Sequence, residues 1–267
     1  MASSESGSLP DVAAKGLEPN RRAWRRSATG LRSLRKPSLR IAIAAATCAI
    51  LIGVSTRLVD RPVATWVHAH LGDERFGWFT ANYEGHLLRL GPFSLMASPA
   101  QALEQLTAFV FAVLAIAALA GWRPGIRGRI VLALCFSVFA VMGVTSAAKA
   151  VFGRTWPESW LGDNPSWIRD SVFGFFPFHQ GAGWGSFPSG HTAVIAATAT
   201  ILWLVWPELR AVWVMLVAVV VAGLIGANYH FVSDIIGGLY LGVAVGLGIV
   251  GLSLSPSDRL ASTRRSR

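Results

Sequence analysis

Six long apolar stretches constrain the fold of this 267-residue chain more than any other feature. A helix needs about 20 mostly apolar residues to cross the hydrocarbon core of a bilayer. Stretches of about this length are centred on Leu39–Leu58, Leu106–Trp122, Ile130–Ala148, Ser189–Trp206, Ala211–Tyr229 and Ile235–Leu254. The composition, 53% hydrophobic and 14% charged, is also wrong for a soluble surface. The sequence therefore predicts an all-α fold, a polytopic membrane bundle of six transmembrane helices.

The net charge of +10 is explained by topology. If both termini are cytoplasmic, 17 of the 24 Lys and Arg residues fall on the cytoplasmic side, as the positive-inside rule requires. We therefore predict a multi-pass protein of the cytoplasmic membrane, with a disordered basic leader (1–38), a membrane domain (39–254) and a basic tail (255–267). No nucleic-acid partner is expected, although the RRAWRR run in the leader leaves acidic lipid or nucleic acid as an alternative ligand.

Two longer segments fall on the predicted outer side. The first contains an amphipathic helix, indicated by the spacing of Val63, Trp66, Val67 and Leu71. Pro92 and Pro99 argue against a further span after it. The second, from Phe152 to Pro188, is a loop rich in Gly, Pro and aromatic residues, and loops of this length are often functional.

Polar residues from three places meet on this outer side. Lys149 ends the third apolar stretch, Ser189, Gly190 and His191 open the fourth, and His230 and Asp234 join the fifth to the sixth. Ionisable groups at membrane depth are costly, so they are candidates for function. The topology therefore predicts a single polar cluster from residues far apart in the sequence.

The chemistry of this cluster favours phosphoryl transfer. Ser189 is placed to cap a helix whose N-terminus attracts anions, and Gly190 allows the backbone to approach a ligand closely. Lys149 adds a positive charge. Two histidines divide the labour, one attacking phosphorus and one protonating the leaving oxygen. Asp234, four residues after His230, lies on the same helical face and fixes its tautomer.

These residues resemble the signature of the type 2 phosphatidic acid phosphatase (PAP2) superfamily, integral membrane lipid phosphatases with three motifs. Lys-x6-Arg-Pro corresponds here to Lys149-Ala-Val-Phe-Gly-Arg154-Thr-Trp156-Pro157, Pro-Ser-Gly-His to Pro188–His191, and Ser-Arg-x5-His-x3-Asp to the segment from Gly223 to Asp234. The resemblance covers roughly 100–254. It implies that His230 is a nucleophile forming a phosphohistidine, Asp234 its partner and His191 the general acid. It also implies that Lys149, Ser189 and Gly190 bind phosphate.

Two motif arginines are absent. Trp156 and Leu224 stand at their positions, and Gly223 replaces the serine before the second. Neither side chain can bind two phosphate oxygens as a guanidinium does. Arg154, two residues before Trp156, is the nearest substitute and is expected to bind substrate; alternatives in the long loop are Arg169 and His179.

The expected function is hydrolysis of a phospholipid or polyprenyl phosphate or diphosphate at the outer leaflet, without a metal or other cofactor. The alternatives are a lipid-to-lipid phosphotransferase and a non-catalytic lipid-phosphate binder that has lost turnover with the two arginines. The spacing of His68 and His70 is weak evidence for a metal site. The glycines Gly237, Gly238, Gly242 and Gly246 indicate close helix packing. The lipid and the oligomeric state stay open.

Overall fold

The structure, a computed structural model, describes residues 37–71, 79–83, 86–159, 164–179 and 181–253. The predicted tail (255–267) and all but the last two residues of the predicted leader (1–38) lie outside the described residues.

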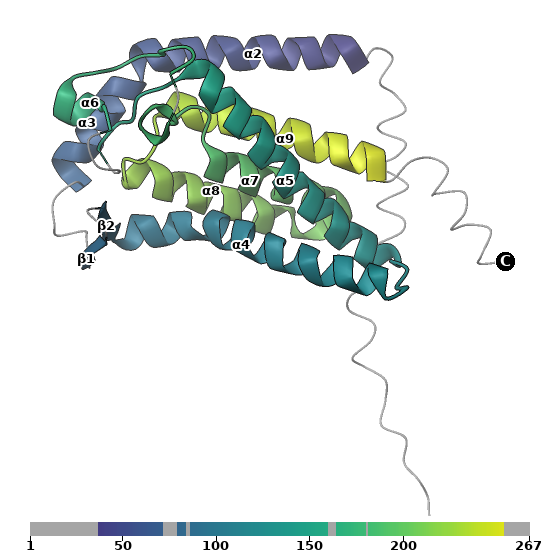
Figure 1. Cartoon of the computed structure of the whole chain (residues 1–267). Coiled ribbons are helices and arrows are strands. Elements are labelled where there is room, and N and C mark those ends of the chain that lie inside the picture. The colour runs from purple at the N-terminus through teal and green to yellow at the C-terminus, as the bar shows by residue number, and fades with distance from the viewer. Residues whose placement is uncertain (1–36, 72–78, 84–85, 160–163, 180, 254–267) are drawn as a thin grey trace, which may run out of the picture.

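Helices make up most of the described chain, and the long ones run side by side in a bundle (Figure 1). The α-helices are α2 (Pro37–Leu58), α3 (Asp60–Leu71), α4 (Pro92–Leu119), α5 (Ile126–Phe152), α6 (Trp167–Asp170), α7 (Gly190–Val205), α8 (Arg210–Gly226) and α9 (Val232–Ser253). Short 3₁₀ turns are η2 (Ala182–Trp184) and η3 (Pro207–Leu209). The exception to helix is an antiparallel hairpin that the sequence did not predict, β1 (Phe79–Tyr83) with β2 (His86–Leu90).

The apolar length of the helices confirms an integral membrane protein. Five helical segments of the described chain are long and apolar enough to cross a bilayer, namely α2, α4, α5, η3 with α8, and α9. The predicted number of six helices of full membrane length was too high by one, although the shorter sixth helix, α7, runs alongside α9 in the same direction, so the chain still passes six times between the ends of the bundle. The fourth predicted span is α7, whose 16 residues extend about 24 Å at 1.5 Å per residue, less than a hydrocarbon core of about 30 Å.

Helix α7 lies inside the bundle. It packs against α9, α5 and α8, and ten of its 16 residues are buried. The contact with α9 is close because α9 presents glycine there: a Cβ on Gly238 would lie 2.5 Å from the Ser189 carbonyl oxygen, and one on Gly246 2.9 Å from the Ala197 carbonyl oxygen. The predicted packing role of these glycines is thus confirmed.

Helix α4 begins before Leu106, where the predicted span starts, and includes both prolines that argue against a further span. Pro92 is the first residue of the helix, where its missing N–H would have no helical partner anyway. Pro99 lies inside the helix and deprives the Leu95 carbonyl of its usual donor. The Ser98 hydroxyl donates to that carbonyl at 2.7 Å instead. A local side chain therefore compensates for the proline, and α4 extends over 28 residues.

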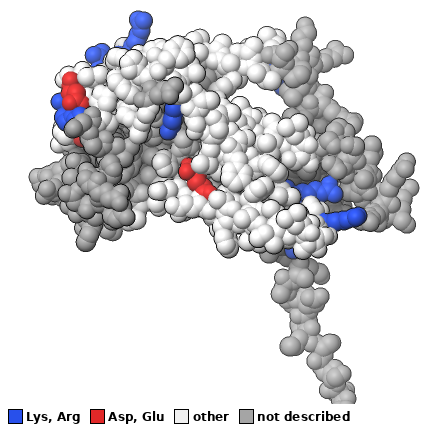
Figure 2. All heavy atoms as spheres, viewed as in Figure 1, with Lys and Arg blue, Asp and Glu red and all other residues white. Residues whose placement is uncertain are grey.

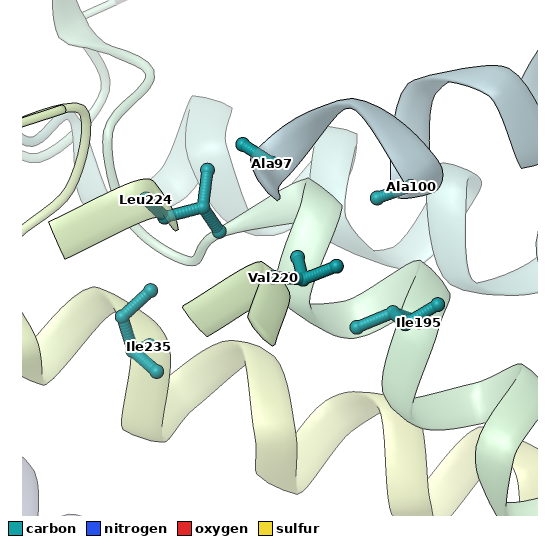
Figure 3. Packing of buried hydrophobic residues seen from close by; sticks show 6 residues of the cluster. All are labelled: Ala97, Ala100, Ile195, Val220, Leu224 and Ile235. Atoms are coloured by element: carbon teal, nitrogen blue, oxygen red, sulfur yellow. The ribbon is translucent and has the colours of Figure 1, made fainter. Parts of the chain in front are cut away.

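A hydrophobic cluster fills the space where α4, α7, α8 and α9 meet (Figure 3). Its members are Ala97, Ala100, Ile195, Val220, Leu224 and Ile235. All are 6% exposed or less. Leu224 thus belongs to the packed interior of the bundle.

The two ends of the bundle differ. The start of α2 and the end of α9 lie at one end, and α3, α6 and the long loop lie at the other (Figure 1). Uncharged atoms cover most of the surface between the ends in the view of Figure 2. The predicted amphipathic helix is α3, with Val67 3% exposed and Trp66 55% exposed. We call the end that holds α3 and α6 the loop end, and it carries the candidate site.

Candidate active site

The N-terminus of α7 brings together three residues expected to bind phosphate. Ser189 is the N-cap residue, and its hydroxyl accepts hydrogen bonds from the Thr192 N–H at 3.4 Å and the Thr192 hydroxyl at 2.9 Å. The predicted cap is therefore confirmed. Lys149, in the last turn of α5, places its ammonium 3.9 Å from the point where a Cβ on Gly190 would lie. A cation thus stands beside the positive end of the α7 dipole.

His230 lies between α8 and α9 and is 5% exposed. Its Nδ1 is 3.5 Å from the Asp234 carboxylate and 3.4 Å from the Ser186 hydroxyl. Burial lowers the pKa of His230 below the ordinary value, and the hydrogen bond and charge of Asp234 oppose this effect. His191 lies within electrostatic range of His230 and Lys149, whose positive charges disfavour a protonated His191. The structure therefore joins both predicted histidines and the predicted aspartate in one cluster.

Asp234 is completely buried and held from several sides. One carboxylate oxygen, Oδ2, accepts from the Ser186 hydroxyl at 2.6 Å and from the Phe231 N–H at 2.9 Å. The other, Oδ1, lies 3.3 Å from the Nε atom of Arg154. Asp234 is therefore fixed before any ligand binds.

Arg154 does not reach the position expected of a substrate ligand. Its side chain is 0% exposed, and its Nη2 donates to the Asp60 carboxylate at 2.7 Å. Phe175 and Phe231 lie over its guanidinium, with centroids 4.2 and 4.8 Å from Cζ. In this conformation the guanidinium is enclosed by protein, on the side of Asp234 that carries Oδ1.

A cavity of about 430 Å³ adjoins the cluster. Lys149, Trp156 and His179 line it, together with Ser146 and Gly185. The Trp156 ring lies 5.3 Å from the His230 ring, so Trp156 stands between the cavity and the histidine, which does not itself line the cavity. The position of the first motif arginine therefore faces the cavity, but Trp156 presents an indole ring there in place of a guanidinium.

The alternatives to the missing arginines separate into two groups. His179 lines the cavity, and its ring lies 4.8 Å from that of Trp184. Arg169 pairs with Asp170 at 2.8 Å, donates to the Asn164 carbonyl at 3.1 Å and does not line the cavity. Asn228 donates to the Ala64 carbonyl at 3.1 Å and is 3% exposed. Only His179 among these three lines the cavity with Lys149.

Two other histidines, both in α3, have contacts of their own. His68 pairs with Glu158, and the His70 ring stacks on Trp66 at 4.8 Å. Within the described ranges, no three His, Cys, Asp or Glu side chains form a group that could hold a metal ion.

Sequence reasoning missed Asp60 and Ser186. Asp60 is 1% exposed and accepts from Ser233, at the start of α9, through both N–H (2.9 Å) and hydroxyl (2.5 Å). Asp60, Ala64 and Val67 share one buried face of α3. An aspartate at helical spacing with apolar residues was thus the signal for Asp60. Nothing in the sequence singled out Ser186.

Residues 130–254 match the model of the PAP2 superfamily. This part of the chain belongs to the PAP2 superfamily. The PAP2 region contains all seven predicted site residues, whereas Asp60 on α3 lies outside it.

The chain is similar to the crystal structure of a transmembrane PAP2-type phosphatidylglycerolphosphate phosphatase from Bacillus subtilis, with 15% identity, a TM-score of 0.42, and coverage of 79% of this chain and 94% of that chain. No curated protein matches.

Proposed function

We propose that this PAP2 protein is a membrane phosphatase that hydrolyses the phosphate or diphosphate headgroup of a phospholipid or polyprenyl lipid. The observation that carries the proposal is the buried His230–Asp234 pair beside Lys149 and the N-terminus of α7. A nucleophile with its orienting carboxylate and an anion-binding helix end are the parts that phosphoryl transfer requires.

The reaction proceeds in two balanced steps. In the first, the neutral Nε2 of His230 attacks phosphorus while the bond from phosphorus to the lipid oxygen breaks, and His191 gives its proton to that oxygen. In the second, His191 removes a proton from water, which attacks the phosphohistidine and releases inorganic phosphate and a neutral His230. Asp234 holds the proton on Nδ1, which leaves the lone pair on Nε2.

The ground state of the substrate is bound mainly by one cation and the backbone. Lys149 and the N–H groups at the start of α7 bind the phosphate oxygens. His179 is placed to contact a headgroup in the cavity, whose Trp156 wall gives it an aromatic side. The lipid tail remains in the bilayer. Because these contacts and both steps use residues of this chain, the proposal includes no metal, other cofactor or nucleic acid.

The loop end faces the outside of the cytoplasmic membrane in this proposal, with both chain termini in the cytoplasm. The distribution of Lys and Arg supports this orientation. The start of α2 and the end of α9 lie at the same end of the bundle, as the orientation requires (Figure 1).

Phosphate release by purified protein tests the proposal. The substrates are phosphatidate, phosphatidylglycerol phosphate and undecaprenyl diphosphate in detergent, with and without a chelator. We expect His230→Ala and His191→Ala each to lower kcat by at least about 100-fold, the lower range for loss of a general acid or nucleophile. His70→Ala is the matched control, because His70 is exposed and stacks on Trp66, and it should keep full activity. Full activity in His230→Ala would refute the proposal, and loss of activity with chelator would refute the metal-free mechanism.

The non-catalytic alternative also rests on a specific observation. Trp156 and Leu224 provide no guanidinium, and Arg154 is paired with Asp60 and Asp234. Acid quenching during turnover of a ³²P-labelled lipid distinguishes the two functions, since the enzyme traps an acid-labile phosphohistidine that His230→Ala cannot form. Binding of the lipid without label transfer to protein would favour the binder. Label transfer from His230 to an added lipid acceptor instead of water would identify a phosphotransferase.

A further inference from the structure

Asp60 lies at the start of α3, outside the PAP2 region, yet it is connected to the candidate active site. Its side chain is fully enclosed and accepts hydrogen bonds from Arg154, Ser233 and the Ser55 hydroxyl, the last at 2.9 Å. Ser233 is the second residue of α9, so Asp60 satisfies an N–H group that a helix start leaves without a helical partner. Asp60 therefore fastens α3 to the beginning of the helix that carries Asp234.

Arg154 connects Asp60 to Asp234. Its Nη2 lies 2.7 Å from Asp60 Oδ2, and its Nε lies 3.3 Å from Asp234 Oδ1. The second contact is an ion pair without hydrogen-bond geometry, and in the described part of the chain neither of its two atoms has another hydrogen-bond partner. Arg154 is the largest fully buried side chain described. Its guanidinium thus joins two carboxylates that are also buried.

Aromatic rings restrict the guanidinium between the carboxylates. The centroids of Phe173, Phe175 and Phe231 lie 5.1, 4.2 and 4.8 Å from its Cζ atom. Removing a single partner from a buried ion pair leaves an uncompensated charge, which costs more than removing both. The buried charges of Asp60, Arg154 and Asp234 are therefore interdependent.

We infer that Asp60 and Arg154 are positioning residues that set the orientation of the Asp234 carboxylate toward His230 and the electrostatic environment of that histidine. This inference rests on the proposed function. Arg154 attracts Oδ1 of Asp234, so that Oδ2 is presented to Nδ1 of His230. Asp60 fixes Arg154 and offsets its charge. Arg154, which was expected to bind substrate, thus acts on the site indirectly, through the Asp234 carboxylate.

The pH dependence of kcat provides a readout that a purely structural role would not change. The charged and titratable groups around His230 are Asp234, Lys149 and His191, with Arg154 and Asp60 behind Asp234. The acid limb of the profile reports protonation of the attacking histidine. Asp60→Asn removes a negative charge and should move this limb to lower pH, because the imidazolium loses stabilisation. Arg154→Gln removes a positive charge and should move the limb to higher pH.

The experiment compares Asp60→Asn, Arg154→Gln, the double variant and Arg154→Lys in the same phosphate-release assay. Each neutral single variant should lower kcat by at least about tenfold, a typical loss for an outer partner of an active-site group, with KM changed less than kcat. Their acid limbs should move in opposite directions by about half a pH unit or more. In the double variant the limb should return close to the wild-type position, because the net charge of the pair is restored to zero. Arg154→Lys keeps the charge and should keep the limb.

Controls separate this inference from the proposed function. Arg210 is the first residue of α8, and its guanidinium lies over the Trp203 ring, away from the site. Arg210→Gln should therefore leave both kcat and the acid limb unchanged. If His230→Ala is inactive but both single variants keep the wild-type limb, the positioning role is wrong and the proposed function stands. If Arg154→Gln fails to fold, the remaining variants still test the inference. Acid limbs at the same pH in Asp60→Asn, the double variant and wild type would overturn it. An active His230→Ala would refute the proposed function instead.

Discussion

The two positions where the PAP2 signature carries arginine have opposite surroundings in this protein. Trp156 is half-buried, lines the cavity with Lys149 and lies 5.3 Å from the His230 ring. Leu224 is 1% exposed and packs in the interior cluster with Ala97 and Val220 (Figure 3). One arginine has been replaced by another side chain facing the site, and the other by a residue that faces the core. The first loss is therefore reversible by a single substitution, whereas the second is not.

The largest effect is expected from Leu224→Arg. A guanidinium in the cluster of α4, α7, α8 and α9 would have no partner, and burying an unpaired charge costs about 5 kcal/mol or more. We expect loss of the monodisperse folded protein in detergent, measured by fluorescence-detected gel filtration, and loss of all phosphate release. Leu224→Met conserves volume and should keep both. A stable and more active Leu224→Arg would show that this position does reach the site.

A smaller effect is expected from Gly223→Ala, at the residue that precedes Leu224. A Cβ on Gly223 would lie 2.6 Å from the Ala97 nitrogen and from the Phe93 carbonyl oxygen, both in the backbone of α4. Overpacking against backbone should destabilise the protein by about 1–3 kcal/mol, seen as a lower midpoint of thermal unfolding. Gly248→Ala, in α9 with nothing within 4 Å of its Cβ, is the control and should not lower the midpoint. An unchanged midpoint in Gly223→Ala would mean that α4 does not pack so closely there.

The sequence could predict which polar residues gather at the loop end, but not what fills the space around them. Hydrophobic length and periodicity located the helices, and the topology brought Lys149, His191 and His230 to one end because hairpins return distant residues to the same level. The contrast between Trp156 and Leu224 was hidden, since a motif position does not reveal which side of a helix or loop faces a neighbour. The burial of Leu224 depends on its packing against α4, and the two prolines in the first part of α4 concealed where that helix starts. The burial of Arg154 was hidden for a related reason: its partner Asp60 is 94 residues away.

Restoring the first motif arginine with Trp156→Arg should strengthen binding of the phosphate group. The guanidinium would enter the cavity beside Lys149, and a hydrogen bond to a charged group contributes about 1.5–3 kcal/mol, or roughly tenfold to 100-fold in affinity. We expect a lower inhibition constant for inorganic phosphate and vanadate in the phosphate-release assay. Trp156→Gln is the matched neutral control, because it also removes the ring. Equal inhibition constants for the two variants would mean that position 156 does not face the bound phosphate.

The smallest effect is a shift in pH dependence caused by the same substitution. Burial lowers the pKa of His230, so the wild-type enzyme should keep its neutral nucleophile, and its kcat, at pH values somewhat below the ordinary histidine value of about 6.5. A positive charge at position 156 disfavours the imidazolium further. The acid limb of kcat for Trp156→Arg should therefore lie at lower pH than that of Trp156→Gln, by less than about one unit across a partly solvated cavity. Comparing the two variants on one substrate cancels the titration of the substrate phosphate. A limb that stays in place, or that moves to higher pH, in Trp156→Arg would show that a charge at position 156 does not act on the group whose protonation sets the limb.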